Sequence, residues 1–215
     1  MNSKKLQTLL HKFPKTYSEE LGINLSRREE SEIFKWFLAS VLFGHRISEN
    51  IAKRTYREFE KEKLATPQSI LNAGWDKLVE VLDRGGYVRY DFSTASALLE
   101  ITQKLKSDYN NSLENLHERA GNAADLEKKL MEFKRIGPVT TNIFLRELRA
   151  VWPKADPKPS KFVILAANDL KVNLKLFNRK TMKFVRLESA LLRYGKELMH
   201  KETHNLPEAF KSSDS

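Results

Sequence analysis

The residues best suited to chemistry form a short turn at positions 133–142, with the sequence Phe-Lys-Arg-Ile-Gly-Pro-Val-Thr-Thr-Asn. Apolar residues recur at helical spacing on both sides of this turn, which predicts a helix-turn-helix hairpin over residues 124–150. Gly137 permits a sharp turn, and Pro138 suits the first position of a helix, where no N–H is needed. Free backbone N–H groups at the start of the second helix can bind a phosphate. The turn therefore predicts contact with a nucleic-acid backbone.

The residue types exclude several other kinds of site. The chain has no cysteine, which rules out disulfides, Cys-ligated zinc and a Cys-held iron–sulfur cluster. Its five histidines show no metal-ligand spacing. We therefore expect no metal and no other cofactor.

The charge balance favours a polyanionic partner. The 215 residues include 38 Lys and Arg against 28 Asp and Glu, a net charge of +10. The alternative is a basic surface with no special role. One segment, residues 171–183, carries five cations and no acid, and it is interpreted either as a phosphate contact or as a solvated basic face. Its cations are Lys171, Lys175, Arg179, Lys180 and Lys183.

Several amphipathic helices must position the turn. The clearest core helix begins at Ser31 as cap, and its apolar residues are Ile33, Phe34, Phe37, Leu38, Val41 and Leu42. Ser48 and Thr66 cap the next two, a fourth runs from Trp75 to a Gly85-Gly86 stop, and a fifth covers residues 92–106 with Phe92 on its apolar side. Trp36, Trp75 and Trp152 are expected in the core.

The sequence pattern changes from amphipathic helices to a proline-rich segment after residue 152. Three prolines within residues 152–160 predict an ordered loop or a lobe boundary. Ser160 then caps a helix to about Asp169, and a long helix follows from about Thr181 to Met199. No β signal is present.

No apolar run approaches the length of a membrane span, and residues 1–16 lack the apolar core of a signal peptide. We therefore expect no membrane partner and a cytoplasmic, nucleoid-associated location.

From Ser31 to about Met199 the chain resembles the helix-hairpin-helix DNA glycosylase superfamily, in particular its endonuclease III type. The family hairpin Leu-Pro-Gly-Val-Gly-Arg-Lys-Thr-Ala-Asn is similar to residues 133–142. Residues 41–45, the Gly85-Gly86-Tyr87 segment and residues 192–195 also resemble family segments. Such hairpins occur in ligases and polymerases too, so the order and spacing of the segments carry the resemblance.

The resemblance implies an all-α, two-lobed helix-hairpin-helix DNA glycosylase fold. Residues 31–152 would form a helical barrel lobe that ends in the hairpin, and residues 1–30 would join 153–215 in the second lobe. The implied partner is double-stranded DNA, bound by a monomer. The implied phosphate-binding residues of the hairpin are Arg135, Ile136, Gly137, Val139 and Thr140.

The chain departs from the family at two catalytic positions. The family's lysine, which forms a Schiff base with the sugar, falls on Val139, and valine cannot form one. The essential aspartate is matched by Asp156 from its spacing, whereas a gapped alignment places Ser160 there and leaves the site empty. As a carboxylate, Asp156 would stabilise an oxocarbenium-like sugar and orient or deprotonate water. The alternative role for Asp156 is that of a turn residue before Pro157.

Five other side chains are candidates for contact with DNA. His45 and Arg46 occupy the turn that presents a residue to the gap left by a flipped base, and the alternative is an exposed polar turn. Tyr87 and Tyr90 either line a cleft and stack on a base or are half-buried packing residues. Arg135 replaces the first glycine of the family hairpin, where it adds a phosphate contact or alters the turn.

Together these features predict a DNA repair glycosylase that hydrolyses an N-glycosidic bond without cleaving the strand. The rival hypothesis is a DNA-binding protein that has the fold without the chemistry. A helical protein that binds RNA or another protein is the third.

Overall fold

The computed structural model describes residues 3–204 of the chain. Within that range every regular element is a helix, so the predicted all-α class is confirmed. None of these helices is both long and apolar enough to span a membrane. The elements are α1 (Ser3–Lys12), α2 (Tyr17–Glu20), η1 (Leu25–Arg27), α3 (Glu30–Phe43), α4 (Glu49–Lys61), α5 (Pro67–Gly85), α6 (Asp91–Tyr109), α7 (Leu113–Arg119), α8 (Ala123–Met131), α9 (Pro138–Glu147), α10 (Lys161–Asp169), η2 (Leu174–Leu176) and α11 (Met182–His204).

The described chain divides into two compact units. Residues 18–157 form the larger unit, and residues 3–17 together with 158–204 form the smaller one. The hairpin and the proline-rich loop up to Pro157 therefore lie in the larger unit. Residues 18–30 and 153–157, which were expected in the second lobe, also belong to the larger unit.

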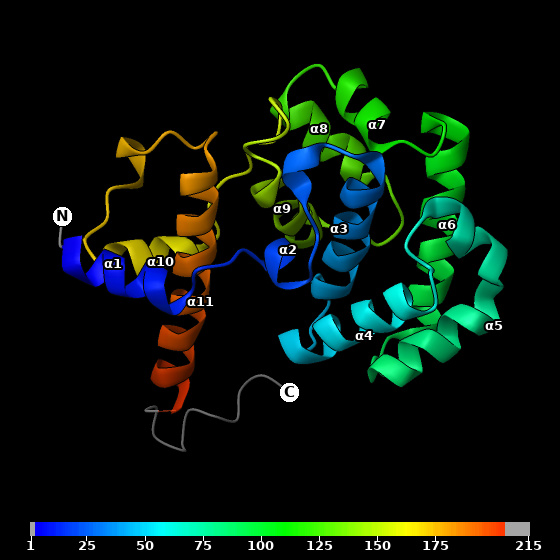
Figure 1. The fold of residues 1–215 in the computed structure, drawn as a ribbon, viewed down its shortest axis with the longest axis horizontal. Coiled ribbons are helices and arrows are strands. Elements are labelled where there is room, and N and C mark those ends of the chain that lie inside the picture. Colours follow the sequence, from blue (N-terminus) through cyan, green and yellow to red (C-terminus); the bar gives the residue numbers. More distant parts are fainter. Residues whose placement is uncertain (1–2, 205–215) are drawn as a thin grey trace. The chain divides into compact units, whose positions relative to one another are not determined.

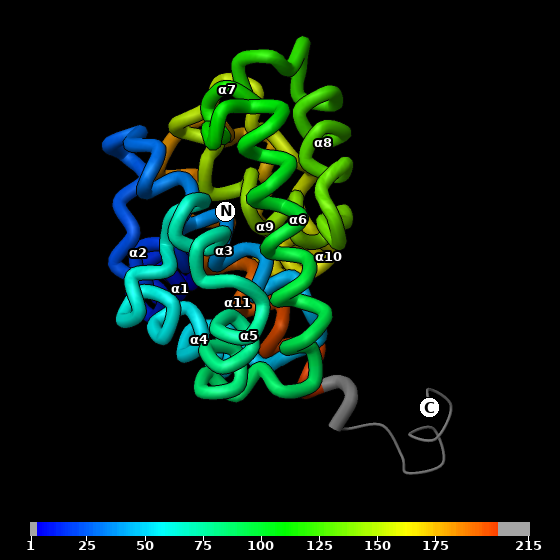
Figure 2. Tube along the Cα trace, turned by 90° about the vertical axis from the view of Figure 1, so that its right-hand side faces the viewer, coloured from blue at the N-terminus to red at the C-terminus, as the bar shows by residue number. Residues whose placement is uncertain are grey.

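Helix α3 forms the centre of the larger unit, with α4, α7 and α9 packed against it (Figures 1 and 2). Its predicted apolar residues are all buried, which confirms it as a core helix. The Trp36 indole donates to the Phe144 carbonyl of α9 at 3.0 Å. Phe37 lies against the rings of Phe133 and Phe144, at centroid distances of 6.0 and 5.1 Å. These aromatic contacts hold both ends of the hairpin on α3.

Most predicted helix caps are present. Ser48, Thr66 and Ser160 each accept a backbone N–H in the first turn of α4, α5 and α10. The predicted cap at Ser31 is wrong, because α3 begins at Glu30 and its N-cap is Glu29, two residues before Ser31, without a side-chain bond. Two acids, Glu30 and Glu32, lie in that first turn instead, where the helix dipole favours negative charge.

Helix α5 consists of two helical segments joined at Gly74, whose φ of 71° and ψ of 177° interrupt the helix. This agrees with the predicted break before Trp75. Gly86, with φ 84°, closes the second segment in the left-handed conformation that glycine adopts without strain.

Two aromatic residues that the sequence placed in the core are exposed. Trp75 is 39% exposed and its indole donates to Ser96 at 3.0 Å, while Phe92 is exposed and lies 5.3 Å from the Trp75 ring. Trp36 and Trp152 are buried, as predicted. Helical spacing alone could not distinguish Trp75 from Trp36 and Trp152. Two aromatic residues at such spacing can pack on each other at the surface, as Trp75 and Phe92 do.

The smaller unit is built on α11, which packs against α10 and α1. A Cβ on Gly195 would lie 2.0 Å from the carbonyl oxygen of Phe162, so only glycine lets these helices approach so closely. Lys12 pairs with Glu197 at 2.8 Å, and the Arg193 guanidinium lies 4.2 Å from the centre of the Tyr17 ring. The family-like segment at 192–195 is thus part of the packing of this unit.

Candidate nucleic-acid interface

The predicted hairpin is present as α8, a turn over residues 132–137, and α9. Pro138 is the first residue of α9, and Thr141 donates its N–H to the Gly137 carbonyl at 3.0 Å. Within the described chain, the N–H groups of Gly137, Val139 and Thr140 meet no hydrogen-bond acceptor. Three N–H donors are therefore available at the start of α9, where the helix dipole also favours an anion.

The sharp bend of this hairpin lies at Arg135, not at Gly137. Arg135 has a φ of 59°, the left-handed conformation that glycine adopts most readily. Gly137 is extended, with φ −101° and ψ −176°, and a Cβ there would meet nothing within 4 Å. The predicted role of Gly137 in bending the chain is therefore wrong. Its absent side chain instead leaves the N-cap open to a ligand.

The five predicted hairpin residues divide into two groups. Arg135 and Val139 are exposed, and Val139 is 63% accessible. The side chains of Ile136 and Thr140 are buried, so only their backbones can reach a phosphate. The prediction for these residues concerned their backbone amides, and their buried side chains fix the turn on the core.

The turn after α3 lies directly against the start of α9. A Cβ on Gly44 would lie 2.0 Å from the Thr140 hydroxyl oxygen, so α3 and α9 meet at van der Waals distance here. His45 and Arg46 follow at once; Arg46 is exposed and His45 is half-buried. Close packing thus brings the predicted gap-filling residues next to the turn of the hairpin.

The His45 ring is held by a network that fixes its protonation. Its Nδ1 lies 3.2 Å from the Val41 carbonyl and 2.9 Å from the Tyr87 hydroxyl, which itself donates to the Leu42 carbonyl at 2.7 Å. All three contacts are satisfied when Nδ1 carries the proton, and Nε2 is then an acceptor. Burial lowers the pKa of His45 below its ordinary value of 6.5, and the Arg135 guanidinium acts in the same direction.

Tyr87 cannot stack on a base, because its side chain is completely buried. It is a packing residue that orients His45, and burial raises the pKa of its phenol. Tyr90 is half-buried, lies 5.1 Å from the His45 ring and carries the Arg89 guanidinium 5.6 Å from its ring centre. Of the two predicted tyrosines, only Tyr90 can contact a nucleotide.

Three turns meet at one place, because the His45 ring lies 5.8 Å from Tyr87 and 5.1 Å from Tyr90, and Gly44 packs on Thr140 of the hairpin. The Arg135 guanidinium acts to lower the pKa of both His45 and Tyr87, which agrees with this arrangement. We call this group the turn cluster: His45, Arg46, Tyr90, Arg135 and the N-terminal backbone of α9. The sequence predicted each member separately. Their proximity is decided by the packing of α3, α5 and α9.

Asp156 is bound by a buried arginine that the sequence analysis missed. The Arg149 side chain is fully buried, and its guanidinium donates to the Asp156 carboxylate and to the Pro157 carbonyl. Asp156 remains 35% exposed. Arg149 stands four residues after Leu145 and three before Trp152, on the apolar face of the chain, and this position was the available signal. The loop around Asp156 is therefore held by a charge-assisted pair.

Ser160, the alternative match for the aspartate, caps α10 by accepting the N–H of Val163 at 3.5 Å. Its hydroxyl has no charge to stabilise a cationic sugar. Among the described residues no group of three or more His, Asp and Glu could hold a metal ion.

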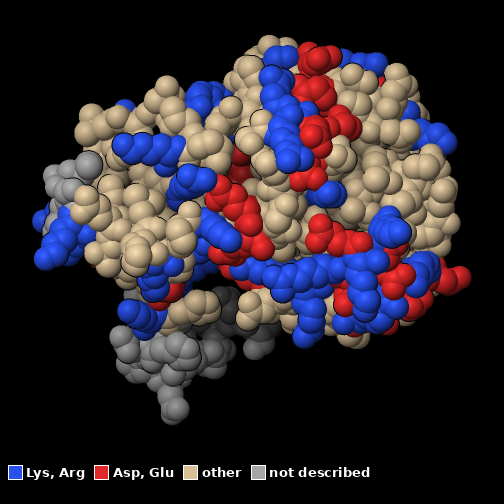
Figure 3. Space-filling model, viewed as in Figure 1, with Lys and Arg blue, Asp and Glu red and all other residues tan. Residues whose placement is uncertain are grey.

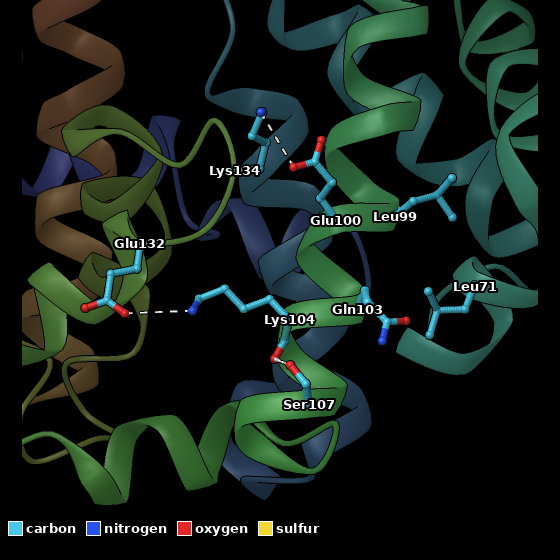
Figure 4. Close-up of a pocket in the computed structure, with 8 residues that line it drawn as sticks. All are labelled: Leu71, Leu99, Glu100, Gln103, Lys104, Ser107, Glu132 and Lys134. Atoms are coloured by element: carbon cyan, nitrogen blue, oxygen red, sulfur yellow. Dashed lines mark hydrogen bonds and ion pairs between the residues drawn. The ribbon is translucent and has the colours of Figure 1, made fainter.

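A separate hollow of about 620 Å³ is lined by residues of α6 together with Leu71, Glu132 and Lys134 (Figure 4). Its two lysines both meet acids: Lys134 lies 3.6 Å from Glu100, and Lys104 lies 3.9 Å from Glu132. The charges that line it are thus balanced within the protein, and we assign no ligand to it.

No family model, no curated protein and no solved structure matches this chain.

Proposed function

We propose that this protein binds duplex DNA through the turn cluster and removes a flipped base by hydrolysis of its N-glycosidic bond. One observation carries the DNA-binding part of the proposal. Three backbone N–H groups without an acceptor lie at the start of α9, beside the exposed Arg135. This combination of a helix N-terminus and a guanidinium binds phosphate in many unrelated proteins.

The neighbouring turn supplies side chains for the duplex itself. A flipped base leaves a gap, and the cost of a few kcal/mol in lost stacking is partly offset by an inserted side chain. Arg46 is exposed and His45 presents the neutral acceptor Nε2 next to the phosphate site. Tyr90 adds a half-buried ring that can stack on a nucleotide.

In this proposal Asp156 supplies the charge for chemistry. A carboxylate stabilises the cationic sugar that forms as the base departs and orients the attacking water. Arg149 is then a positioning residue, because it fixes one carboxylate oxygen of Asp156. The exposed Val139 stands where the family has its lysine and provides no amine. The product is therefore an abasic site in an intact strand.

The Arg149–Asp156 pair also favours the second candidate, a DNA-binding protein without catalytic activity. A carboxylate already bound to a guanidinium has part of its charge neutralised, and it serves well as a clamp for the loop. Under this hypothesis the turn cluster still binds DNA, and base release never occurs.

The two candidates are separated with the Asp156→Asn variant, which keeps an oxygen for Arg149 and removes the charge. Wild-type and variant proteins are incubated with duplexes that carry oxidised, alkylated, deaminated or mismatched bases, and base release and duplex affinity are both measured. The glycosylase proposal expects base release to be lost and affinity to be kept. Equal base release by both proteins would remove Asp156 from the mechanism. If neither protein released a base from any duplex, the DNA-binding protein without catalytic activity would be the remaining candidate.

The position of Val139 provides a gain-of-function test. The glycosylase proposal expects Val139→Lys to form a Schiff base that borohydride traps on a substrate from which the wild-type protein releases a base. Val88→Lys is the matched control, because Val88 is 62% exposed in the same unit and receives the same charge. Equal trapping by the two variants would show that Val139 does not face the sugar.

A further inference from the structure

The net positive charge of this protein lies in only one of its two units. Residues 18–157, which contain the hairpin, hold 22 Lys and Arg and 22 Asp and Glu. The described residues of the smaller unit hold 15 Lys and Arg and only 4 Asp and Glu. In Figure 3 blue and red lie side by side over α4, whereas the surface over α1 and α10 is tan with blue patches and little red. The net charge that attracts a polyanion over a long distance therefore belongs to the smaller unit.

The excess is greatest in residues 171–183, which we call the basic segment. It connects α10 to α11 and is drawn in orange in Figure 1. Lys171 and Lys175 line a shallow groove on α10, and Lys183 lies in the first turn of α11. All three lysines are exposed, and none forms an ion pair with a carboxylate among the side chains that the structure describes.

No carboxylate near these three lysines in the described chain accounts for their positions. Asp169 is the only acid from residue 158 to 187, and its carboxylate accepts a hydrogen bond from the Tyr194 hydroxyl at 2.8 Å. Lys161 and Lys183 stand in the first turns of α10 and α11, where the helix dipole disfavours a cation. Like charges collected in this way destabilise the unit unless a negative partner is bound.

The backbone of the basic segment is ordered by its own side chains. Asn173 accepts the N–H of Lys175 at 3.1 Å, and Asn178 accepts the N–H of Lys180 at 2.9 Å. The Thr181 hydroxyl donates to the Asn178 carbonyl at 2.9 Å. These turns order the backbone around Lys175 and Lys180, so less backbone conformational entropy is lost when an anion binds.

We propose that the basic segment is a second, sequence-independent contact to the phosphates of duplex DNA. The choice of duplex DNA rests on the proposed function: the hairpin unit offers N–H donors for a phosphate but has no net charge to attract one. The smaller unit provides the attraction through Lys171, Lys175 and Lys183, and the hairpin provides the defined phosphate site. Each phosphate contact of this kind releases counterions, and its contribution falls as salt rises.

The test compares two triple variants of the full chain that have the same net charge. One replaces Lys171, Lys175 and Lys183 with Gln, and the other replaces the exposed Lys61, Lys63 and Lys106 of the larger unit. Affinity for an undamaged duplex is measured by fluorescence anisotropy over a series of salt concentrations. The basic-segment variant should lower the slope of log K against log salt by about 2.7, at about 0.9 for each phosphate contact. The control variant should keep the wild-type slope.

Other outcomes distinguish this proposal from the proposed function. An unchanged slope for the basic-segment variant, or an equal loss in the control, overturns the second contact and leaves the hairpin site intact. If the basic-segment variant has a lower slope than the wild-type protein, and the wild-type protein releases no base from any duplex, the second contact is supported and the proposed glycosylase activity is refuted. Vesicles of phosphatidylserine are the other anionic probe: loss of vesicle binding with an unchanged DNA slope would assign the segment to membrane lipids instead.

Discussion

Replacing Arg135 with glycine should make the protein more stable and a weaker binder of DNA. Arg135 holds a φ of 59°, where its Cβ is close to backbone atoms. Its side chain is exposed and adjoins the free N–H groups of α9. The substitution removes the backbone strain, which should raise stability, and it removes the guanidinium, which should lower the affinity for DNA.

The size of each effect follows from the geometry. Relief of the left-handed conformation contributes about 1–2 kcal/mol. The greater freedom of glycine in the unfolded chain offsets about 0.4–1 kcal/mol of this. A net gain of about 0.5–1 kcal/mol corresponds to a rise in Tm of about 1–4 °C for a chain of this size. Loss of one charge-assisted phosphate contact costs roughly 1.5 kcal/mol, or about tenfold in Kd.

Lys63→Gly is the matched control. Lys63 is also exposed, lies in the same unit and has a φ of 58°, so relief of strain there should raise Tm by a similar amount. Its affinity for DNA should equal that of the wild-type protein. Tm is measured by calorimetry, affinity by anisotropy, and the pKa of His45 by NMR; in Arg135→Gly that pKa should rise toward its ordinary value. A lower Tm with unchanged affinity would refute both the strain and the phosphate contact.

Three further changes test the packing and the buried polar groups of the larger unit. Gly44→Ala should lower the free energy of unfolding by about 1–3 kcal/mol through its clash with the Thr140 hydroxyl, and adding Thr140→Ala should restore part of this in a double-mutant cycle. Burial lowers the pKa of both His45 and His117 in the folded protein, so these histidines bind protons at a higher pH in the unfolded chain than in the folded one. The free energy of unfolding should therefore be constant above about pH 6.5 and fall as the pH drops below it. His117→Phe should reduce this pH dependence, as measured by denaturation curves at several pH values. Arg149→Leu should lower the free energy of unfolding by about 1–3 kcal/mol through loss of its hydrogen bonds to the loop, as measured by urea unfolding, and an unchanged midpoint would contradict a clamp.

Local patterns predicted the helices well. Ser48, Thr66 and Ser160 cap helices because a side-chain oxygen that satisfies a free N–H acts over only three residues. The buried face of α3 followed from its apolar spacing. Trp75 shows the limit: its spacing matched a core residue, and only the three-dimensional neighbourhood decided that it faces solvent.

The candidate site was predictable only in part. The hairpin and its free donors follow from a glycine and a proline between two amphipathic helices. The burial of Tyr87, Ile136 and Thr140 did not follow, because burial depends on what packs against a residue from distant parts of the chain. The Arg149–Asp156 pair was equally hidden, since an arginine on an apolar face can be buried only if a partner from another segment reaches it.

The sequence by itself determined an all-α protein with a helix-turn-helix hairpin and a large positive charge, because caps, turns and helical periodicity are short-range effects and charge is a simple sum. The tertiary structure decided that Arg135, rather than Gly137, makes the bend, and that His45 and Tyr90 join it. It also decided which residues form each compact unit, and thereby that the excess of positive over negative charge belongs to the smaller unit. These outcomes depend on long-range packing, in which each side chain is positioned by residues far away in the sequence.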